Sequence, residues 1–422
     1  MVLPGKVMFI SVHGDPLATL GSIQSGGQNV YVRELILALE SRGMRIDVFT
    51  HWSNPKSPQV EPLGRYSRII RLPAGCKGFL SKHQMFGILP AFTKELNKYL
   101  GNLCQYNIIH SNYWLSGWVG LQFQKKHCIP RVHTSHSLGT VRKGALDTSG
   151  NESLGVRLCI ERELLREADR VIATTPLERD ILTDSYSVLP ENISVVPCGV
   201  NIELFHPIHK KHTKGRKIIL FVGRFEENKG LEILLKSLAI LKEKYPSTAA
   251  GYCLVIAGGD RLELPPESLS SEKKKFLEFI RENGISDMVT FAGPVKHKDL
   301  PAYYTDASIT VVPSYYESFG LVAVEAMACG CPVIASRTGG LQHNVLDGKT
   351  GLLVEPKNPE KLTSAINYLL TNGRVRKQMS REAALHGRKF SWHKIAYDMV
   401  NIYKEVTGWK RMYSVKKAQS TS

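Results

Sequence analysis

Short runs of β-branched and aromatic residues alternate with helix-length amphipathic stretches along almost the whole chain, and this alternation limits the folds open to it. It is typical of a parallel sheet covered by helices, because parallel strands need a crossover between them. Seven strand-like runs precede residue 200 and six follow residue 215. The sequence therefore predicts an α/β protein with two doubly wound, Rossmann-like parallel sheets.

Length also favours two domains, since 422 residues exceed what one hydrophobic core usually organises. The segment 198–217 between the halves is rich in charge and turn formers and lacks periodicity, which indicates a junction. The predicted domains are 1–205 and 206–390, with a last helix at 391–408 and a basic tail at 409–422.

Composition argues against several classes of protein. The apolar runs are far shorter than the roughly 20 residues that span a bilayer, and the first lacks the features of a secretory signal. The eight cysteines are scattered, and the close pair Cys329 and Cys331 has no histidine nearby, which favours reduced core thiols over zinc or disulfides. We expect a cytoplasmic protein without a membrane partner.

The chain is basic, with 55 Lys+Arg against 38 Asp+Glu and a formal net charge of +17. Nucleic-acid binding would call for a concentrated basic stripe with interleaved aromatic residues. Here the cations are spread along the chain, and a preference for anionic small molecules fits at least as well. No nucleic-acid partner is predicted.

Two cations follow the first strand of the second half, in the stretch FVGRFEENKG. Arg224 and Lys229 would lie at the carboxyl edge of the sheet, where parallel sheets bind ligands. An arginine fork and a lysine point charge suit a diphosphate. Their spacing alone is also compatible with two solvated loop charges.

Two glutamates, Glu317 and Glu325, interrupt a stretch that otherwise reads as buried core. Glu317 falls in the loop after a predicted strand, and Glu325 lies on the helix that follows. Carboxylates suit hydroxyl groups, and the free amides at a helix start suit phosphate, so a nucleotide sugar would satisfy both. On spacing alone, the two residues could equally be one solvated surface glutamate and one helix glutamate that pairs with a lysine. The amides in question belong to Phe319, Gly320, Leu321 and Val322.

Together these motifs resemble those of the retaining family 4 glycosyltransferases of GT-B architecture. The resemblance rests on Glu317-x7-Glu325 followed by ACGCPVIASRTGG, on FVGR and NKG, and on the early GGQNVYV, in the family's order in both halves. It implies two Rossmann-like domains facing an interdomain cleft, with the C-terminal helix crossing back to the first domain. It also implies that no metal or other cofactor is required.

The resemblance implies roles for individual residues. Arg224 and Lys229 would hold the donor diphosphate, Glu325 the ribose, and Glu317 with the following amides the sugar. Gly27, just before the helix predicted at Val30–Ser41, would approach the donor closely. Front-face attack is the family's favoured account, so we interpret Glu317 as a sugar-binding, charge-stabilising group rather than a covalent nucleophile.

The first half carries segments that resemble the sucrose-phosphate synthases and the inositol-phosphate N-acetylglucosaminyltransferases of mycothiol synthesis, such as HSNYWLSGW and HTSHSLGTVRKGAL. Both families use a phosphorylated acceptor. His136 matches the histidine that lies over the donor sugar, whereas His110 and His133 are interpreted as structural. The predicted acceptor site comprises Gly27 and Gln28 together with Lys82, Tyr113, Ser137 and Arg157. The last four match the positions that bind the acceptor phosphate in the inositol-phosphate enzymes.

The choice between these relatives depends on few residues. Gln28, in GGQ, and the sequence HSLG resemble the sucrose-phosphate synthases. We therefore predict a minimal bacterial form that transfers glucose from UDP-glucose to fructose 6-phosphate, giving sucrose 6-phosphate. Inositol-phosphate transfer is the alternative, and sucrose synthase is disfavoured by the phosphate pocket. A non-catalytic nucleotide-sugar sensor or a basic RNA-associated protein is the hypothesis from a different class.

Overall fold

The computed structural model describes residues 5–18, 26–75, 77–101, 105–141, 152–208, 216–259 and 270–408. Its contacts divide the chain into two compact units. The first contains the described residues up to Gly199 together with those from Trp392 on, and the second is Val200–Ser391. The boundary predicted after residue 205 falls inside the second unit, because Phe205 packs against the rings of His297 and Tyr304. The predicted basic tail at 409–422 lies outside the described residues.

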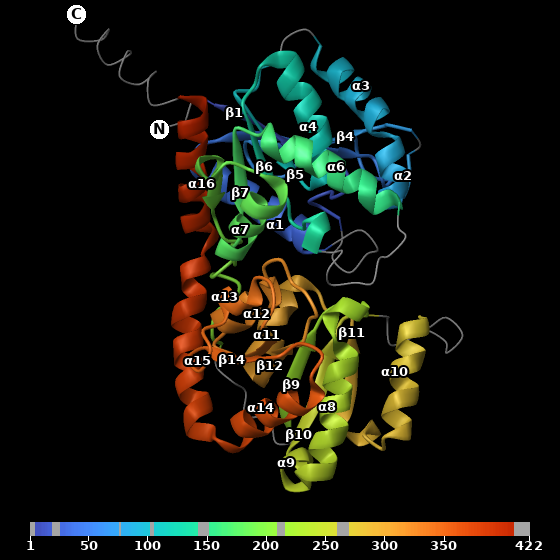
Figure 1. Ribbon diagram of the computed structural model, residues 1–422, viewed down its shortest axis with the longest axis vertical. Coiled ribbons are helices and arrows are strands. Elements are labelled where there is room, and N and C mark those ends of the chain that lie inside the picture. Colours follow the sequence, from blue (N-terminus) through green and yellow to red (C-terminus); the bar gives the residue numbers. More distant parts are fainter. Residues whose placement is uncertain are drawn as a thin grey trace, which may run out of the picture. The chain divides into compact units, whose positions relative to one another are not determined.

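The first unit contains one sheet in the order β3-β4-β2-β1-β5-β6-β7-β8, parallel except for β3. Figure 1 labels β1, β4, β5, β6 and β7 of this sheet. Strand order reverses beside β1, which pairs with both β2 and β5. This makes the loops after β1 and β5 the expected ligand edge. The strands are β1 (Lys6–Ile10), β2 (Arg45–His51), β3 (Val60–Pro62), β4 (Ser67–Leu72), β5 (Ile108–Asn112), β6 (Arg131–Thr134), β7 (Arg170–Ala173) and β8 (Ile193–Val195).

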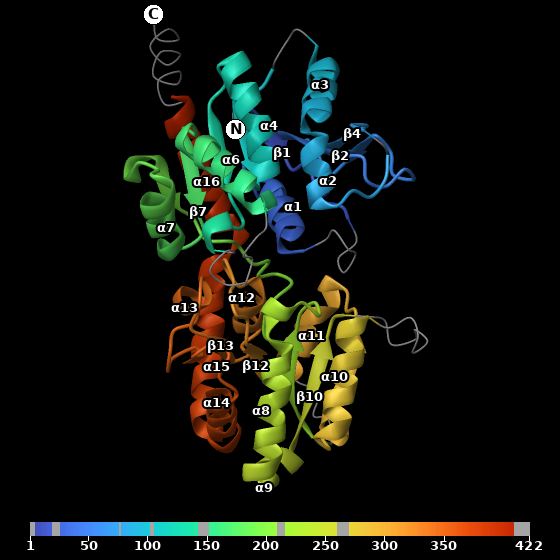
Figure 2. The same cartoon turned by 45° about the vertical axis from the view of Figure 1, so that its right-hand side comes forward.

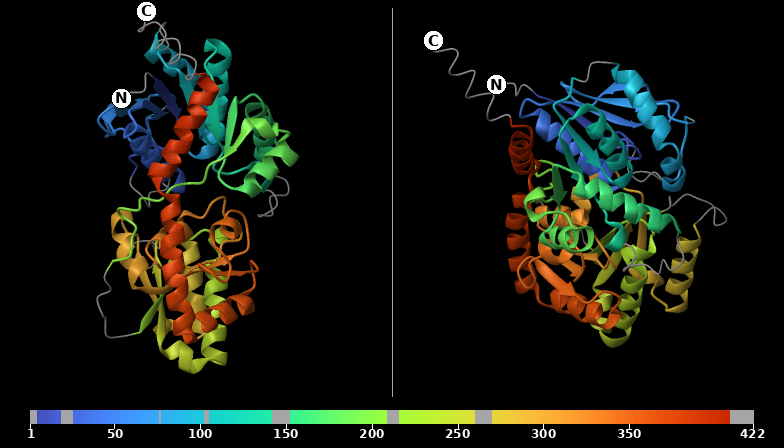
Figure 3. Two further views of the ribbon diagram at one scale, coloured as in Figure 1. Left: turned by 90° about the vertical axis from the view of Figure 1, so that its left-hand side faces the viewer. Right: turned by 45° about the horizontal axis from the view of Figure 1, so that its top comes forward.

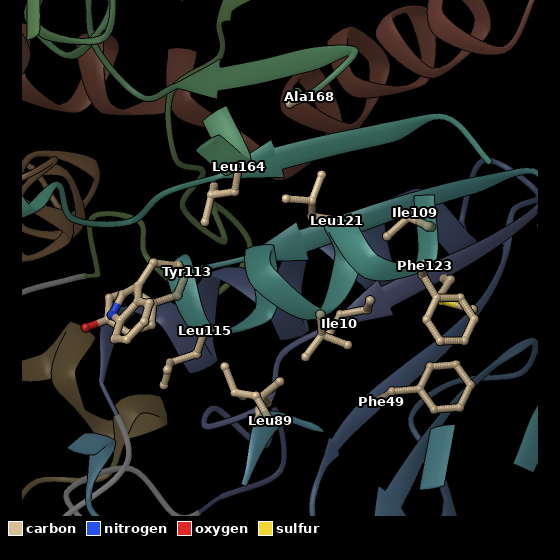
Figure 4. Close-up of a cluster of buried hydrophobic side chains, with 14 of the residues drawn as sticks. Ile10, Phe49, Leu89, Ile109, Tyr113, Leu115, Leu121, Phe123, Leu164 and Ala168 are labelled. Carbon is tan, nitrogen blue, oxygen red and sulfur yellow. The ribbon is translucent and has the colours of Figure 1, made fainter. Parts of the chain in front are cut away.

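Helices pack on this sheet around one buried cluster, which includes Leu115 and Phe123 of α4 and Ile10 of β1 (Figure 4). The last helix, α16, packs against α1 (Figure 3), because Ile395, Met399 and Tyr403 recur on one buried face. The helices are α1 (Gly27–Glu40), α2 (Lys82–Gly87), α3 (Leu89–Leu100), α4 (Trp114–His127), α6 (Glu152–Arg166), α7 (Pro176–Tyr186) and α16 (Trp392–Thr407).

The second unit has a wholly parallel sheet in the order β11-β10-β9-β12-β13-β14. Strand order reverses between β9 and β12, so the loops after these two strands form the expected ligand edge. The strands are β9 (Lys217–Val222), β10 (Tyr252–Ala257), β11 (Val289–Gly293), β12 (Ala307–Val312), β13 (Val333–Ser336) and β14 (Gly351–Val354).

Around this second sheet, α8 packs against α10 and α14, and α12 packs against α11 and α15 (Figure 2). None of the described helices in either unit is both long and apolar enough to cross a membrane. The helices are α8 (Leu231–Lys244), α9 (Pro246–Ala250), α10 (Ser271–Glu282), α11 (Leu300–Asp306), α12 (Leu321–Ala328), α13 (Leu341–Asn344), α14 (Pro359–Thr371) and α15 (Gly373–Gly387).

The loops after β9 and β12 of the second sheet approach each other closely at one glycine. Gly230 has φ +68°, and a Cβ there would lie 2.0 Å from the carbonyl oxygen of Pro313, just after β12. We expect Gly230→Ala to lower the free energy of unfolding by about 2–3 kcal/mol, from the positive φ and the overpacking together. Denaturant titration would measure it.

Gly284→Ala is the matched control, since Gly284 has φ +63° and its Cβ would meet no described atom within 4 Å. It should cost about 1 kcal/mol, the strain of a positive φ alone. Equal losses for both substitutions would contradict a close approach of the two loops.

Candidate active site

The carboxyl edge of the second sheet brings together two predicted site residues that lie 88 positions apart. Lys229, at the end of the loop after β9, donates from Nζ to Glu317 Oε2 at 2.6 Å. The two side chains are 24% and 22% exposed, so the pair is partly screened from solvent. Each keeps a face for a ligand, because an ammonium carries three donors and a carboxylate has a second oxygen.

Backbone contacts fix the loop that carries Glu317. The Tyr315 amide donates to the carbonyl of Asn228, which joins the loop after β12 to the loop after β9. The Gly340 amide donates to the carbonyl of Glu317. Arg224 lies in the same edge but is half exposed, and its guanidinium pairs with Glu226 at 2.8 Å. Of the two predicted cations, Lys229 is thus sheltered and Arg224 is exposed.

Glu325 is held from two sides on α12. His297 Nε2 donates to its Oε1 at 2.7 Å, and the Tyr304 hydroxyl donates to its Oε2 at 3.0 Å. Burial and the Glu325 charge raise the pKa of Tyr304 well above its ordinary value, which keeps that phenol a donor. Glu325 is only 6% exposed, and the hydrogen bonds to both carboxylate oxygens set its orientation before any ligand arrives.

Helix α12 begins at the loop that carries Glu317. Its N-cap is Gly320, with φ 92°, and no side chain caps the first turn. The residues at this start are Phe319, Gly320, Leu321 and Val322, as predicted for an anion-facing turn. First-turn amides lack intrahelical acceptors, so they can donate to a phosphate or a sugar oxygen.

In the first unit, the predicted Gly27 and Gln28 are the first two residues of α1, which starts three residues earlier than its apolar pattern indicates. Asn29 connects this helix start to the loop after β1, because its side-chain amide donates to the carbonyl of Asp15 at 2.8 Å. Gln28 Nε2 lies 3.5 Å from the Ser11 hydroxyl. These residues occupy the ligand edge beside β1.

Three of the four residues predicted to bind the acceptor phosphate lie together. Arg157 donates from Nη2 to the carbonyl and the hydroxyl of Ser137 at 2.8 and 3.2 Å, and its Nη1 lies 3.4 Å from the Tyr113 hydroxyl. The fourth, Lys82, is the first residue of α2, and its side chain lies outside the described part of the structure. The cluster confirms the proximity of these three residues and leaves their ligand untested.

Arg157 is more buried than a surface phosphate-binding arginine. It is 5% exposed, and its Nε donates to Glu161 Oε1 at 2.6 Å. Although burial opposes the charge, Tyr113 and Glu161 raise the pKa of Arg157 above its ordinary value. Because Nε and Nη2 are engaged, this arginine offers a ligand its Nη1 group rather than a bidentate fork.

Glu161 organises this cluster. Besides Arg157, it accepts hydrogen bonds at Oε2 from the Gly139 amide at 2.9 Å and from the Tyr186 hydroxyl at 2.6 Å. Burial and the Glu161 charge raise the pKa of Tyr186, so that phenol stays protonated and donates. Glu161 therefore joins α6, α7 and the loop after β6.

His136 is the second residue after β6, with φ 59°, and Tyr113 directly follows β5, with φ 73°. Such backbone angles are uncommon for residues with a side chain and cluster at functional sites. His136 contacts the Tyr31 ring edge-on, with centroids 4.8 Å apart, and its Nε2 lies 2.9 Å from Asn112 Oδ1. His110 and His133 are fully buried in the sheet, as their structural interpretation requires.

The sequence analysis did not identify the residues whose hydrogen bonds orient the predicted site residues. No motif marks His297 and Tyr304 as partners of Glu325, or Asn112 as the partner of His136. For Glu161 a signal existed, because it lies four residues after Arg157 on a predicted helix, the spacing of an ion pair.

Known families and proteins match this chain along most of its length. Residues 25–204 match the family described as Glycosyltransferase Family 4, and residues 205–386 match Glycosyl transferases group 1. A D-inositol 3-phosphate glycosyltransferase from Acidothermus cellulolyticus is 34% identical, over 99% of this chain and 94% of that protein. One from Corynebacterium jeikeium is 36% identical, over 95% of this chain and 97% of its own.

Among solved structures, a sucrose-phosphate synthase from Thermosynechococcus elongatus has a TM-score of 0.85 and 35% identity, covering 96% of this chain and 99% of its own. Anabaena HepE in complex with UDP and glucose has a TM-score of 0.73 at 19% identity, covering 95% of this chain and 100% of its own, which supports the fold alone. With both halves matched in order and two parallel-sheet units, the chain belongs to the family 4 glycosyltransferases and has the GT-B fold.

Proposed function

We propose that the protein is a retaining glucosyltransferase that moves glucose from UDP-glucose to fructose 6-phosphate, giving sucrose 6-phosphate. The observation that carries this proposal is the buried Arg157 cluster with Tyr113 and Ser137, because a phosphorylated acceptor needs a cation and hydroxyl donors in one place. The 35% identity to a sucrose-phosphate synthase over nearly both whole chains supports this choice of acceptor.

In the proposed donor site, Lys229 meets the charge of the diphosphate and the half-exposed Arg224 adds a second contact. Placing cations before the reaction stabilises the departing diphosphate without reorganisation. Glu325 keeps lone pairs beyond those used by His297 and Tyr304, and these accept from the ribose hydroxyls. The reaction as proposed uses its two substrates and no resident cofactor.

Glu317 is proposed to bind the sugar rather than to attack it. Its 2.6 Å contact with the Lys229 ammonium withdraws charge from the carboxylate and makes it a poorer nucleophile. In front-face transfer, the acceptor hydroxyl oxygen bonds to the anomeric carbon as the bond to the diphosphate oxygen breaks. The hydroxyl proton passes to that departing oxygen. The configuration is retained because the new bond forms on the face of the sugar from which the diphosphate leaves.

Transfer to an inositol phosphate is the second candidate, because the curated relatives at 34% and 36% identity are D-inositol 3-phosphate glycosyltransferases. The same Arg157 cluster would serve either acceptor. Gln28, on the first turn of α1, is the residue that favours fructose 6-phosphate.

The test is product formation from UDP-glucose with fructose 6-phosphate, free fructose or inositol phosphate offered separately, repeated with UDP-N-acetylglucosamine, ADP-glucose and GDP-glucose. We expect turnover with UDP-glucose and fructose 6-phosphate. Turnover with inositol phosphate alone would leave the Arg157 cluster as the proposed phosphate site. It would also show that Gln28 does not indicate fructose 6-phosphate as the acceptor. Stoichiometric UDP-sugar binding without turnover would reject the enzyme in favour of a sensor.

A further inference from the structure

The Asn112–His136 contact determines which ring nitrogen carries the proton. Asn112 is fully buried at the end of β5, and its Nδ2 points to the carbonyl oxygen of His110 at 3.4 Å. A flipped amide would set oxygen against that oxygen, so Oδ1 is the atom that faces His136. Since Oδ1 can only accept, His136 Nε2 must bear a hydrogen across the 2.9 Å contact.

The surroundings keep the His136 ring neutral. Burial lowers its pKa from its ordinary value to about 3. The titratable groups near the ring are Tyr31 of α1, edge-on to it, and the buried His110 and His133 of β5 and β6. Burial also lowers the pKa of His110, to about 3, and of His133, so neither histidine brings a charge near neutral pH.

We propose that Asn112 is a positioning residue that locks His136 as the neutral Nε2–H tautomer, leaving Nδ1 as a hydrogen-bond acceptor for a hydroxyl of the transferred sugar. The placement of that sugar rests on the proposed function. Nδ1 has no hydrogen-bond partner among the described residues, and His136 as a residue keeps some solvent-exposed surface. His136 thus acts as an acceptor, and neither as a general acid nor as a cation.

The first experiment needs no substrate. The ¹⁵N shifts of the His136 ring, assigned by the signal lost in His136→Gln, should show a protonated Nε2 and a bare Nδ1 from pH 6 to 8. A protonated Nδ1, or a charged ring in this range, would overturn the proposal. This result stands whichever glycosyl acceptor the enzyme uses.

The second experiment tests positioning through a pH profile of kcat/KM for Asn112→Asp with the substrate pair found active. A carboxylate favours the imidazolium, so it raises the histidine pKa, and the ring then loses its acceptor as pH falls. If that pKa reaches about 7, activity at pH 6 should be about tenfold below that at pH 8, relative to wild type.

Asn97→Asp is the matched control, because Asn97 is a partly buried asparagine on α3 that bonds Thr93 and Lys126. Its profile should follow wild type. An Asn112→Asp profile parallel to wild type, with a normal ¹⁵N pattern in that variant, would overturn the positioning role. If the variant fails to fold, the ring shifts of the wild-type protein decide alone. Absence of turnover with every substrate would reject the proposed function, whereas the tautomer would still be decided.

Discussion

Lys229→Ala is expected to lower kcat by about 10²–10³-fold, the scale for removing one preorganised electrostatic stabiliser. Negative charge grows on the diphosphate as its bond to the sugar breaks, and the ammonium stabilises that charge. Loss of the ammonium therefore destabilises the transition state more than it destabilises the bound donor. The substitution also frees Glu317, which then repels the diphosphate. Steady-state kinetics with saturating donor would measure the fall.

Two variants separate this role from general damage. Lys236→Ala removes a lysine that pairs with Glu232 on the exposed face of α8 in the same unit, and it should leave kcat within about twofold. Lys229→Arg keeps the charge and should recover part of the activity. Turnover in Lys229→Ala equal to wild type would remove Lys229 from the mechanism and leave the half-exposed Arg224 as the main cation.

The strands were the most predictable part of the molecule. All thirteen predicted runs form strands, because buried parallel strands are short, continuous and apolar, and glycine or polar loops bound them. β3 was missed because it has three residues and pairs antiparallel at the sheet edge. The start of α1 was misplaced because Gly27 and Gln28 lack an apolar pattern, although they continue the helix.

The candidate site could be predicted as a set of residues and not as a set of contacts. Motifs identified Lys229, Glu317 and Glu325, yet the Lys229–Glu317 pair depends on β9 and β12 being neighbours, which strand patterns alone do not determine. The partner of Glu325 in α11, Tyr304, is one tyrosine among 16 in the chain, with nothing local to mark it.

For Arg157, too, the sequence indicated a possible ligand but not the contacts of the side chain. Its positive charge suggested a phosphate ligand, but the sequence could not show that the guanidinium would be buried against Glu161. Removing one member of a buried ion pair leaves an uncompensated charge and is strongly destabilising. A simple Arg157→Ala test of acceptor binding would therefore mix lost binding with lost stability.

Glu161→Gln is expected to lower the free energy of unfolding by about 3–5 kcal/mol, because it keeps the shape of the side chain and leaves the Arg157 cation without its partner. Denaturant titration followed by fluorescence would measure the loss. Glu163→Gln is the matched control, since Glu163 pairs with Lys125 on the exposed part of α6 and should cost less than about 1 kcal/mol.

The double variant Arg157→Met with Glu161→Gln separates stability from function. It removes both charges while the glutamine oxygen still accepts from Gly139 and Tyr186, so most of the lost stability should return. If Arg157 binds the acceptor phosphate, this stable protein should still show a KM for the acceptor raised at least tenfold and an unchanged KM for the donor. A stable double variant with a normal acceptor KM would make the Arg157–Glu161 pair purely structural, and the phosphate would then have to be bound by Lys82 and the start of α1.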